Sequence, residues 1–248
     1  MEGYEPPTYG NRIADIYDEL YGQLFDVDAT VDFLAGIAGD GPALELAIGT
    51  GRIALPLASR GIEVHGIDIS EAMVAKLRAK PGGDKIPVTI GDFADVGVDG
   101  QFPLIFVAFN TLFALTTQED QIRCFRNVSD RLAPNGVFVI EAFVPDLSRF
   151  DRHQRVSVER LGLDDVQLEA SRHDPAAQKV ESQHVVISGD DVSLYPVHLR
   201  YAWPSELDLM ARLAGLRLRD RFGGWKGEAF DSSSQFHVSV YERGEVTA

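Results

Sequence analysis

Cysteine is almost absent from this sequence. The 248 residues contain one, Cys124, so the chain cannot form an internal disulfide and nothing indicates an oxidising compartment. Cys124 lies in a stretch with a helical pattern, where a buried structural cysteine is the ordinary interpretation. A nucleophilic cysteine is the alternative, but no partner histidine lies nearby in the sequence. No Gly-x-Ser-x-Gly sequence occurs either, so hydrolase chemistry has no support.

Basic residues and long apolar runs are also scarce. Lys and Arg number 23 against 38 Asp and Glu, a net charge of −15. Nucleic acids and anionic membranes are bound through Lys and Arg, so we expect neither as a partner. The longest apolar run, 104–109, is far shorter than the roughly 20 residues of a membrane helix. The first residues lack the basic and apolar segments of a signal peptide, so we expect a cytoplasmic protein.

Clustered metal ligands are lacking as well. His173, His184, His198 and His237 are scattered without the close spacing of a zinc site. The sequence therefore predicts no metal centre.

Strand and helix patterns alternate over the first part of the chain. Strands are expected over 43–48, 62–67, 88–90, 104–109 and 137–142, and helices over 12–21, 30–38, 52–60, 70–79 and 118–132. Such alternation implies right-handed crossovers and a mostly parallel sheet covered on both faces.

The pattern changes after residue 146. Four runs alternate apolar and polar residues, over 156–160, 166–173, 180–188 and 192–203, which predicts antiparallel strands with one wet face. A helix over 204–213 and strands over 216–222 and 236–241 complete the pattern. We predict a Rossmann-like α/β domain formed by residues 1–146 and 204–248. An antiparallel β cap is inserted at 147–203.

A glycine-rich loop follows the first expected strand. In Glu45-Leu-Ala-Ile-Gly49-Thr-Gly51-Arg-Ile-Ala54, glycine permits a tight turn and close backbone approach to a cofactor. The spacing also satisfies a relaxed dinucleotide fingerprint. Glu45 separates the two interpretations, because a carboxylate inside a central strand is costly unless it is paired. A cofactor with cationic groups, such as S-adenosylmethionine (AdoMet), would pair with it; a structural ion pair is the alternative.

Acidic residues follow the next two strands. Asp68, at the tip of the second strand, can accept hydrogen bonds from both hydroxyls of a ribose, although it could instead cap the next helix. In Gly91-Asp92-Phe93, after the third strand, the aspartate can accept from an adenine amino group while Phe93 contacts the ring. An ordinary turn aspartate is the alternative there.

An aromatic loop follows the fourth strand. It reads Phe109-Asn110-Thr111-Leu-Phe113-Ala-Leu115 and lies at the edge of the sheet where open α/β folds bind ligands. The alternative is that its aromatic side chains belong to the core.

These motifs, with Leu132-Ala-Pro-Asn-Gly136, resemble in order those of class I AdoMet-dependent methyltransferases over residues 40–145. The resemblance implies a seven-stranded sheet with a reversed last strand, AdoMet as methyl donor and S-adenosylhomocysteine (AdoHcy) as product. It places Glu45 near the methionine part, Asp68 at the ribose and Asp92 at the adenine. The cofactor-binding residues that we expect are Arg12, Tyr17, Glu45, Ala47, Gly49, Gly51, Arg52, Asp68, Ile69, Met73, Gly91, Asp92, Phe93, Phe109, Asn110, Thr111 and Leu115.

The opening Tyr9-Gly-Asn-Arg-Ile-Ala-Asp-Ile-Tyr17-Asp-Glu-Leu-Tyr21 is similar to that of antibiotic-tailoring N-methyltransferases of the aminosugar and lincosamide type. The inserted cap and its ending Val197-His-Leu-Arg-Tyr-Ala-Trp203 share this similarity. It implies that residues 1–25 close over AdoMet as a lid, with Tyr9, Tyr17 and Phe113 at the site of methyl transfer. The aminosugar enzymes often carry a histidine after the fourth strand, where this sequence departs with Leu112-Phe113-Ala114.

We expect methylation of an amine nitrogen of a small molecule in bacterial natural-product metabolism. The rings of Tyr9, Tyr17 and Phe113 suit a cationic amine, and the loop over 109–115 contains no titratable base. Methyl transfer to a hydroxyl is the alternative, for which His184 or His198 on the cap could serve as base.

Further expectations concern the acceptor, the cofactor and the assembly. Trp203 is a third candidate contact of the acceptor, beside the two cap histidines. An NAD-dependent oxidoreductase would leave Glu45 and Asp92 unexplained, and a non-catalytic AdoMet-binding regulator would leave the lid and the cap unexplained. The exposed edges of the cap could pair two copies of the chain in a homo-oligomer.

Overall fold

The computed structural model describes residues 3–22, 26–39 and 41–244. Its main sheet has seven strands in the order β3-β2-β1-β4-β5-β11-β10. The first five are parallel, and β11 runs antiparallel to both β5 and β10. Their bounds are β1 Ala43–Leu46, β2 Val64–Asp68, β3 Val88–Ile90, β4 Phe102–Val107, β5 Leu132–Phe143, β10 Leu216–Phe222 and β11 Phe236–Arg243. The predicted seven-stranded sheet with a reversed last strand is confirmed.

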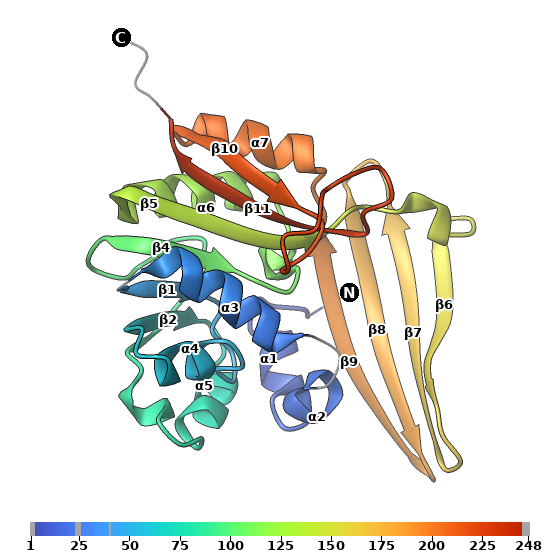
Figure 1. Ribbon diagram of the computed structural model, residues 1–248. Helices are drawn as coiled ribbons and strands as arrows, with labels where there is room; N and C mark the ends of the chain where they lie inside the picture. The colour runs from blue at the N-terminus through green and yellow to red at the C-terminus, as the bar shows by residue number, and fades with distance from the viewer. Residues whose placement is uncertain (1–2, 23–25, 40, 245–248) are drawn as a thin grey trace.

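Helices cover both faces of this sheet, as Figure 1 shows. On one face lie α3 (Val27–Ala38), α4 (Ala54–Ser59) and α5 (Glu71–Arg78); on the other lie α6 (Gln118–Arg131) and α7 (Pro204–Leu213). Alternate residues of β4 feed the two cores: Leu104 and Phe106 pack on the α3 side, Ile105 and Val107 on the α6 side. Cys124 of α6 is buried in the second core, and burial raises the pKa of its thiol. The structural interpretation of this cysteine therefore fits.

The predicted helix over 12–21 is two short helices, α1 (Thr8–Ile13) and α2 (Tyr17–Tyr21). Each is tied to a different element. The Ser70 hydroxyl donates to Asn11 Oδ1 of α1 at 2.7 Å, while Thr50 of the glycine loop donates to Asp18 Oδ1 of α2 at 2.6 Å. These two anchors replace one continuous helix by a bent lid. Residues 1–2 and 23–25 of the predicted lid lie outside the described residues.

The cap is a separate antiparallel sheet in the order β6-β7-β8-β9. Its strands are β6 Gln154–Leu161, β7 Asp165–Asp174, β8 Lys179–Ser188 and β9 Asp191–Arg200, and Figure 1 shows β9 beside the α/β domain. Buried Arg200 fixes its base: its guanidinium donates to Gln121 Oε1 of α6 at 2.7 Å and to Glu206 Oε1 of α7 at 2.7 Å. The cap is thereby attached to both helices on one side of the main sheet.

The outer face of the cap is more apolar than the predicted wet face. The strand register puts Val158, Leu168, Val185 and Leu194 opposite one another in one row. Val158 and Leu194 are exposed.

The described residues also form the short 3-10 helices η1 (Gly83–Lys85), η2 (Thr111–Ala114) and η3 (Leu147–Arg149). Among the described residues, no helix combines the length and hydropathy needed to span a membrane.

Candidate active site

A cavity of 520 Å³ lies at the carboxyl ends of the central strands, where the sheet, the lid helices and the cap meet. This volume is within the range of roughly 300–1,000 Å³ that is usual for small-molecule sites. Most of the predicted site residues line it. They are Tyr9, Tyr17, Glu45, Ala47, Gly49, Arg52, Asp68, Ile69, Met73, Asp92, Phe93, Phe109, Asn110, Thr111, Leu115, His184 and His198.

The glycine loop turns sharply between β1 and α4. Ala47, Gly49 and Gly51 all have positive φ, of 56°, 56° and 77°. At Gly51 a side chain would also collide with Leu77 of α5, so this position needs glycine for both conformation and space. The loop therefore brings its backbone to the cavity edge in a conformation that glycine adopts at Gly49 and Gly51 without strain.

Asp68 braces this loop from the tip of β2. Its Oδ2 accepts from the Gly49 N–H at 2.7 Å and its Oδ1 from the Ser70 N–H at 2.8 Å. Burial raises the pKa of the carboxyl, and the two N–H donors oppose this rise. The cap of α5 is Ser70, whose Oγ accepts from the Met73 N–H at 3.2 Å. Asp68 is therefore free of the helix-capping role and presents its carboxylate at the cavity.

Glu45 is a buried acid inside β1, only 5% exposed. Its Oε2 has no hydrogen-bond partner among the described residues, and burial raises the pKa of the carboxyl well above its usual range. Nearby Asp68 raises this pKa further, whereas Arg52 lowers it. A buried polar atom without a partner is costly. A cationic ligand in the cavity would satisfy it, so the residues present fit AdoMet.

Tyrosines of the lid close one side of the cavity. The Tyr9 hydroxyl donates to the Tyr21 hydroxyl at 3.3 Å, and the ring of Tyr21 meets Phe109 edge-on at 5.5 Å. Burial raises the pKa of Tyr17 to about 12 and that of Tyr9 well above its usual value. These phenols therefore stay protonated at neutral pH and act as hydrogen-bond donors rather than bases.

The lid is also locked to the glycine loop by charge. Asp18 of α2 pairs with Lys80 at 2.6 Å, and the Lys80 ammonium donates to the Thr50 carbonyl at 2.9 Å. Together with the Thr50 hydroxyl, these contacts connect the lid to the turn that shapes the cavity.

Two histidines of the cap line the cavity, and their pKa values are shifted in opposite directions. Burial opposes protonation of His184, but Glu159, whose Oε2 lies 3.1 Å from Nδ1, overcomes this and raises its pKa. His198 stacks on Tyr4 with ring centroids 3.9 Å apart, and burial lowers its pKa. His184 is thus the better placed of the two to exchange a proton near neutral pH.

Five predicted residues lie elsewhere. Phe113, expected at the site of methyl transfer, is fully buried and packs edge-on against Phe143 at 5.0 Å, because η2 turns its ring into the core. Arg12 is exposed on α1. Gly51 and Gly91 shape the site without lining it, and the Gly91 N–H donates to the Asp68 carbonyl. Trp203 lines a different cavity.

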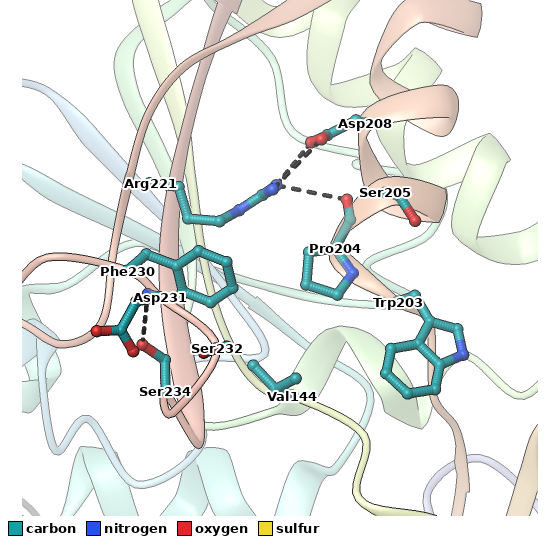
Figure 2. A pocket seen from close by; sticks show the side chains of 10 residues that line it. All are labelled: Val144, Trp203, Pro204, Ser205, Asp208, Arg221, Phe230, Asp231, Ser232 and Ser234. Atoms are coloured by element: carbon teal, nitrogen blue, oxygen red, sulfur yellow. Dashed lines mark hydrogen bonds and ion pairs between the residues drawn. The ribbon is translucent and has the colours of Figure 1, made fainter.

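This second cavity, of 560 Å³, lies between the start of α7 and the segment 223–235 (Figure 2). Figure 2 shows Arg221 pointing at Asp208 and the Pro204 carbonyl. The guanidinium is 2.6 Å from Asp208 Oδ1 and also donates to Ser239 Oγ at 2.8 Å. The positive charge of Arg221 is thus paired with Asp208 and does not face the cavity as a free cation. The cofactor motifs line the first cavity.

Sequence reasoning missed several residues of the site. Tyr21 lies one helical turn after Tyr17 and lines the same cavity, a spacing that could have revealed it. Glu141, which holds the cavity-lining Phe109, is an acid within an apolar strand, as Glu45 is, and the same argument about buried carboxylates would have singled it out. Within the described part of the chain, no group of three or more His, Cys, Asp or Glu could hold a metal ion.

Comparison with known proteins identifies clear relatives. A family model described as a methyltransferase domain matches residues 43–136. The CcbJ methyltransferase from Streptomyces caelestis is 42% identical, with a TM-score of 0.92 over 97% of this chain and 100% of that chain. The cypemycin N-terminal methyltransferase from a Streptomyces species is 26% identical over 96% of this chain and 99% of its own length. AdoMet-bound CalS10, an amino pentose methyltransferase of calicheamicin biosynthesis from Micromonospora echinaspora, is 20% identical. It has a TM-score of 0.69 and covers 92% and 96% of the two chains, which shows the shared fold.

Proposed function

The chain belongs to the class I AdoMet-dependent methyltransferases, and we propose that it methylates an amine nitrogen of a small natural product. The observation that carries this proposal is the buried, unpartnered carboxylate oxygen of Glu45 beside the glycine loop braced by Asp68. Both face a cavity closed by tyrosines. A cationic cofactor and a cationic acceptor both suit such a site.

Different residues of the cavity would contact different parts of the cofactor. Asp68 accepts the Gly49 and Ser70 N–H groups on different oxygens, and the Ile69 N–H also favours its charged form. A carboxylate has about four acceptor sites, so capacity for a ribose hydroxyl remains. Glu45 and Gly49 would face the methionine part. Asp92 and Phe93 would hold the adenine; the Oδ1 atom of Asp92 already accepts from the Ala94 N–H at 2.8 Å.

AdoMet supplies a methyl group on a sulfonium, which needs no further activation. The protein's task is to hold the acceptor in line and keep water out, effects that can supply about 7–11 kcal/mol. Tyr9, Tyr17 and Tyr21 present protonated hydroxyls and ring faces at this position. Hydroxyl oxygens accept from an ammonium, and ring faces attract its charge. An amine attacks once it has lost a proton, so no strong base is required.

The name of one relative supports an amine acceptor, since the cypemycin enzyme is named an N-terminal methyltransferase. The experiment is a comparison of paired acceptors that differ only in an amino or a hydroxyl group, such as amino sugars and their parent sugars. AdoHcy release measured by mass spectrometry should occur with the amines. AdoHcy release with the hydroxyl partners alone would contradict the proposal.

A hydroxyl acceptor is the second candidate, and one observation favours it. His184 of the cap lines the cavity, and Glu159 holds its Nδ1 at 3.1 Å, an arrangement that resembles a base held by a carboxylate. It would take the hydroxyl proton during attack. The two histidine variants described in the Discussion distinguish this candidate from the amine.

We also propose that the cap insertion, residues 147–203, pairs two copies of the chain. Exposed Val156, Val158, Val192 and Leu194 on its strands support this, since apolar sheet surface and free edges favour association. Sedimentation of wild type against Val158→Asp tests the idea. We expect the wild type to sediment as a dimer and the variant as a monomer, and a monomeric wild type would contradict it.

A further inference from the structure

We propose that Glu141 is a positioning residue for cofactor binding. It holds Phe109 in a left-handed backbone conformation, so that the ring stands in the cavity between Arg52 of the glycine loop and Tyr21 of the lid. This inference rests on the proposed function, because it gives the Phe109 ring a place in the AdoMet site.

The turn after β4 has an unusual backbone. Phe109 and Asn110 both have φ of 62°, in the left-handed region. Asparagine tolerates this region, but a bulky residue such as phenylalanine is an outlier there. Such a conformation persists only where the surroundings hold it, and it gathers at functional sites.

One residue of the neighbouring strand supplies the restraint. The Phe109 N–H donates to Glu141 Oε2 at 2.7 Å, and the Asn110 N–H donates to the Glu141 carbonyl at 3.2 Å. The Asn110 side chain closes the arrangement by accepting from the Phe143 N–H at 2.6 Å. The side chain and main chain of Glu141 thus bind the N–H groups of both left-handed residues.

The restrained ring joins two parts of the cavity wall. The Arg52 guanidinium lies 4.7 Å from the centroid of Phe109, within the range of a cation–π contact. Tyr21 of the lid meets the same ring edge-on, with centroids 5.5 Å apart. If the backbone relaxed to negative φ, the ring would leave this position, and its contacts with Arg52 and Tyr21 would be lost.

The carboxylate of Glu141 has partners besides the Phe109 N–H, and they lie on the same side of the molecule as the Phe109 turn. Burial raises the pKa of Glu141, while the Phe109 N–H, the Trp225 side chain and Arg52 favour its charged form. Trp225 belongs to the segment between β10 and β11 and packs on Phe33 of α3. The partners of Glu141 therefore converge on the cavity and on the segment next to it.

The experiment measures AdoHcy affinity by calorimetry in a double-mutant cycle with Glu141→Ala and Phe109→Gly. Glycine adopts positive φ freely and has no ring, so it removes both the strain and the element that Glu141 positions. We expect Glu141→Ala to weaken AdoHcy binding at least about tenfold, but less than about twofold in the Phe109→Gly background. Glu141→Gln keeps a carbonyl oxygen for the Phe109 N–H and should bind within about threefold of wild type.

A matched control separates positioning from stability. Glu206→Ala removes another poorly exposed, hydrogen-bonded carboxylate, at the base of the cap and outside the cavity lining. It should lower the melting temperature and leave AdoHcy affinity unchanged. If Glu141→Ala does not fold, Glu141→Met fills the space without an acceptor, and failure of both to fold would overturn the assignment.

The outcomes distinguish this inference from the proposed function. Wild-type protein that does not bind AdoHcy would contradict the proposed function itself. Wild type that binds AdoHcy, with Glu141→Ala binding equally well or with additive effects of the two substitutions, would overturn only the role of Glu141.

Discussion

The carboxylate of Asp68 accepts the backbone N–H of Gly49 at 2.7 Å, across the two central strands β2 and β1. This hydrogen bond fixes the glycine loop to the residue that we propose to bind the ribose. Loop geometry and ribose recognition are therefore coupled through one side chain, and its loss should affect both.

Asp68→Ala should weaken AdoHcy binding by roughly tenfold or more, because hydrogen bonds to a charged group contribute about 1.5–3 kcal/mol each. The protein should remain folded, which circular dichroism can check. Calorimetry that gives an affinity within about twofold of wild type would contradict the ribose assignment.

Tyr9→Phe and Tyr17→Phe should reduce turnover more than stability. Both hydroxyls lie at the cavity, and Tyr9 loses only a long hydrogen bond to Tyr21, of 3.3 Å. A lid completes the site and shields it from water. Steady-state kinetics on an amine that the wild type methylates, together with melting temperatures, checks this. Full activity in both variants would contradict the lid role and leave α1 and α2 with a packing role alone.

The anchor of the lid should depend on pH. Burial would raise the pKa of Asp18, but its hydrogen bonds with Lys80 and Thr50 prevail and lower it. A lowered folded-state pKa stabilises the protein above the unfolded value of about 3.9, and this contribution disappears as pH falls through the folded-state pKa. Asp18→Asn should therefore destabilise at neutral pH by less than about 1 kcal/mol, since the pair is partly exposed.

Urea unfolding at neutral pH and at about pH 2 measures the difference in free energy of unfolding between wild type and Asp18→Asn. Asp15→Asn, which removes a highly exposed partner of Lys76, is the control and should have a smaller effect at neutral pH. A stability difference for Asp18→Asn that grows on acidification would show that the sign is wrong.

Variants of the two cap histidines distinguish nitrogen from oxygen as the attacking atom of the acceptor. With an amine acceptor, His184→Ala and His198→Ala should each keep activity, and the rate should rise with pH along the acceptor's own titration. With a hydroxyl acceptor, the rate should follow a protein group above about pH 6.5, because Glu159 raises the pKa of His184. Loss of turnover in folded His184→Ala would favour oxygen.

Local patterns predicted most of the fold and the cofactor side of the cavity. Period-two and helical repeats located strands such as Val88–Ile90 and the helix Pro204–Leu213 at their observed bounds. Proline suits the first turn of a helix, which explains the start at Pro204. The glycine loop, Asp68 and Asp92 were recognisable because each directly follows a strand, and parallel strands end at one edge of the sheet.

Features that depend on tertiary contacts were out of reach. The break between α1 and α2 follows from separate anchors at Ser70 and Thr50, far along the chain. Phe113 and Phe109 look alike in the sequence, yet the left-handed turn held by Glu141 brings only Phe109 to the cavity. Which face of the cap is exposed likewise depends on how the inserted sheet packs against the α/β domain.

The central claim is that the cavity beside Glu45 and Asp68 binds AdoMet, and a thermal unfolding comparison tests it most directly. A ligand that binds only the folded state raises the melting temperature. We predict that saturating AdoHcy raises the melting temperature of the wild type, that NAD leaves it unchanged, and that Asp68→Ala loses most of the AdoHcy effect. Stabilisation by NAD without stabilisation by AdoHcy would contradict the account.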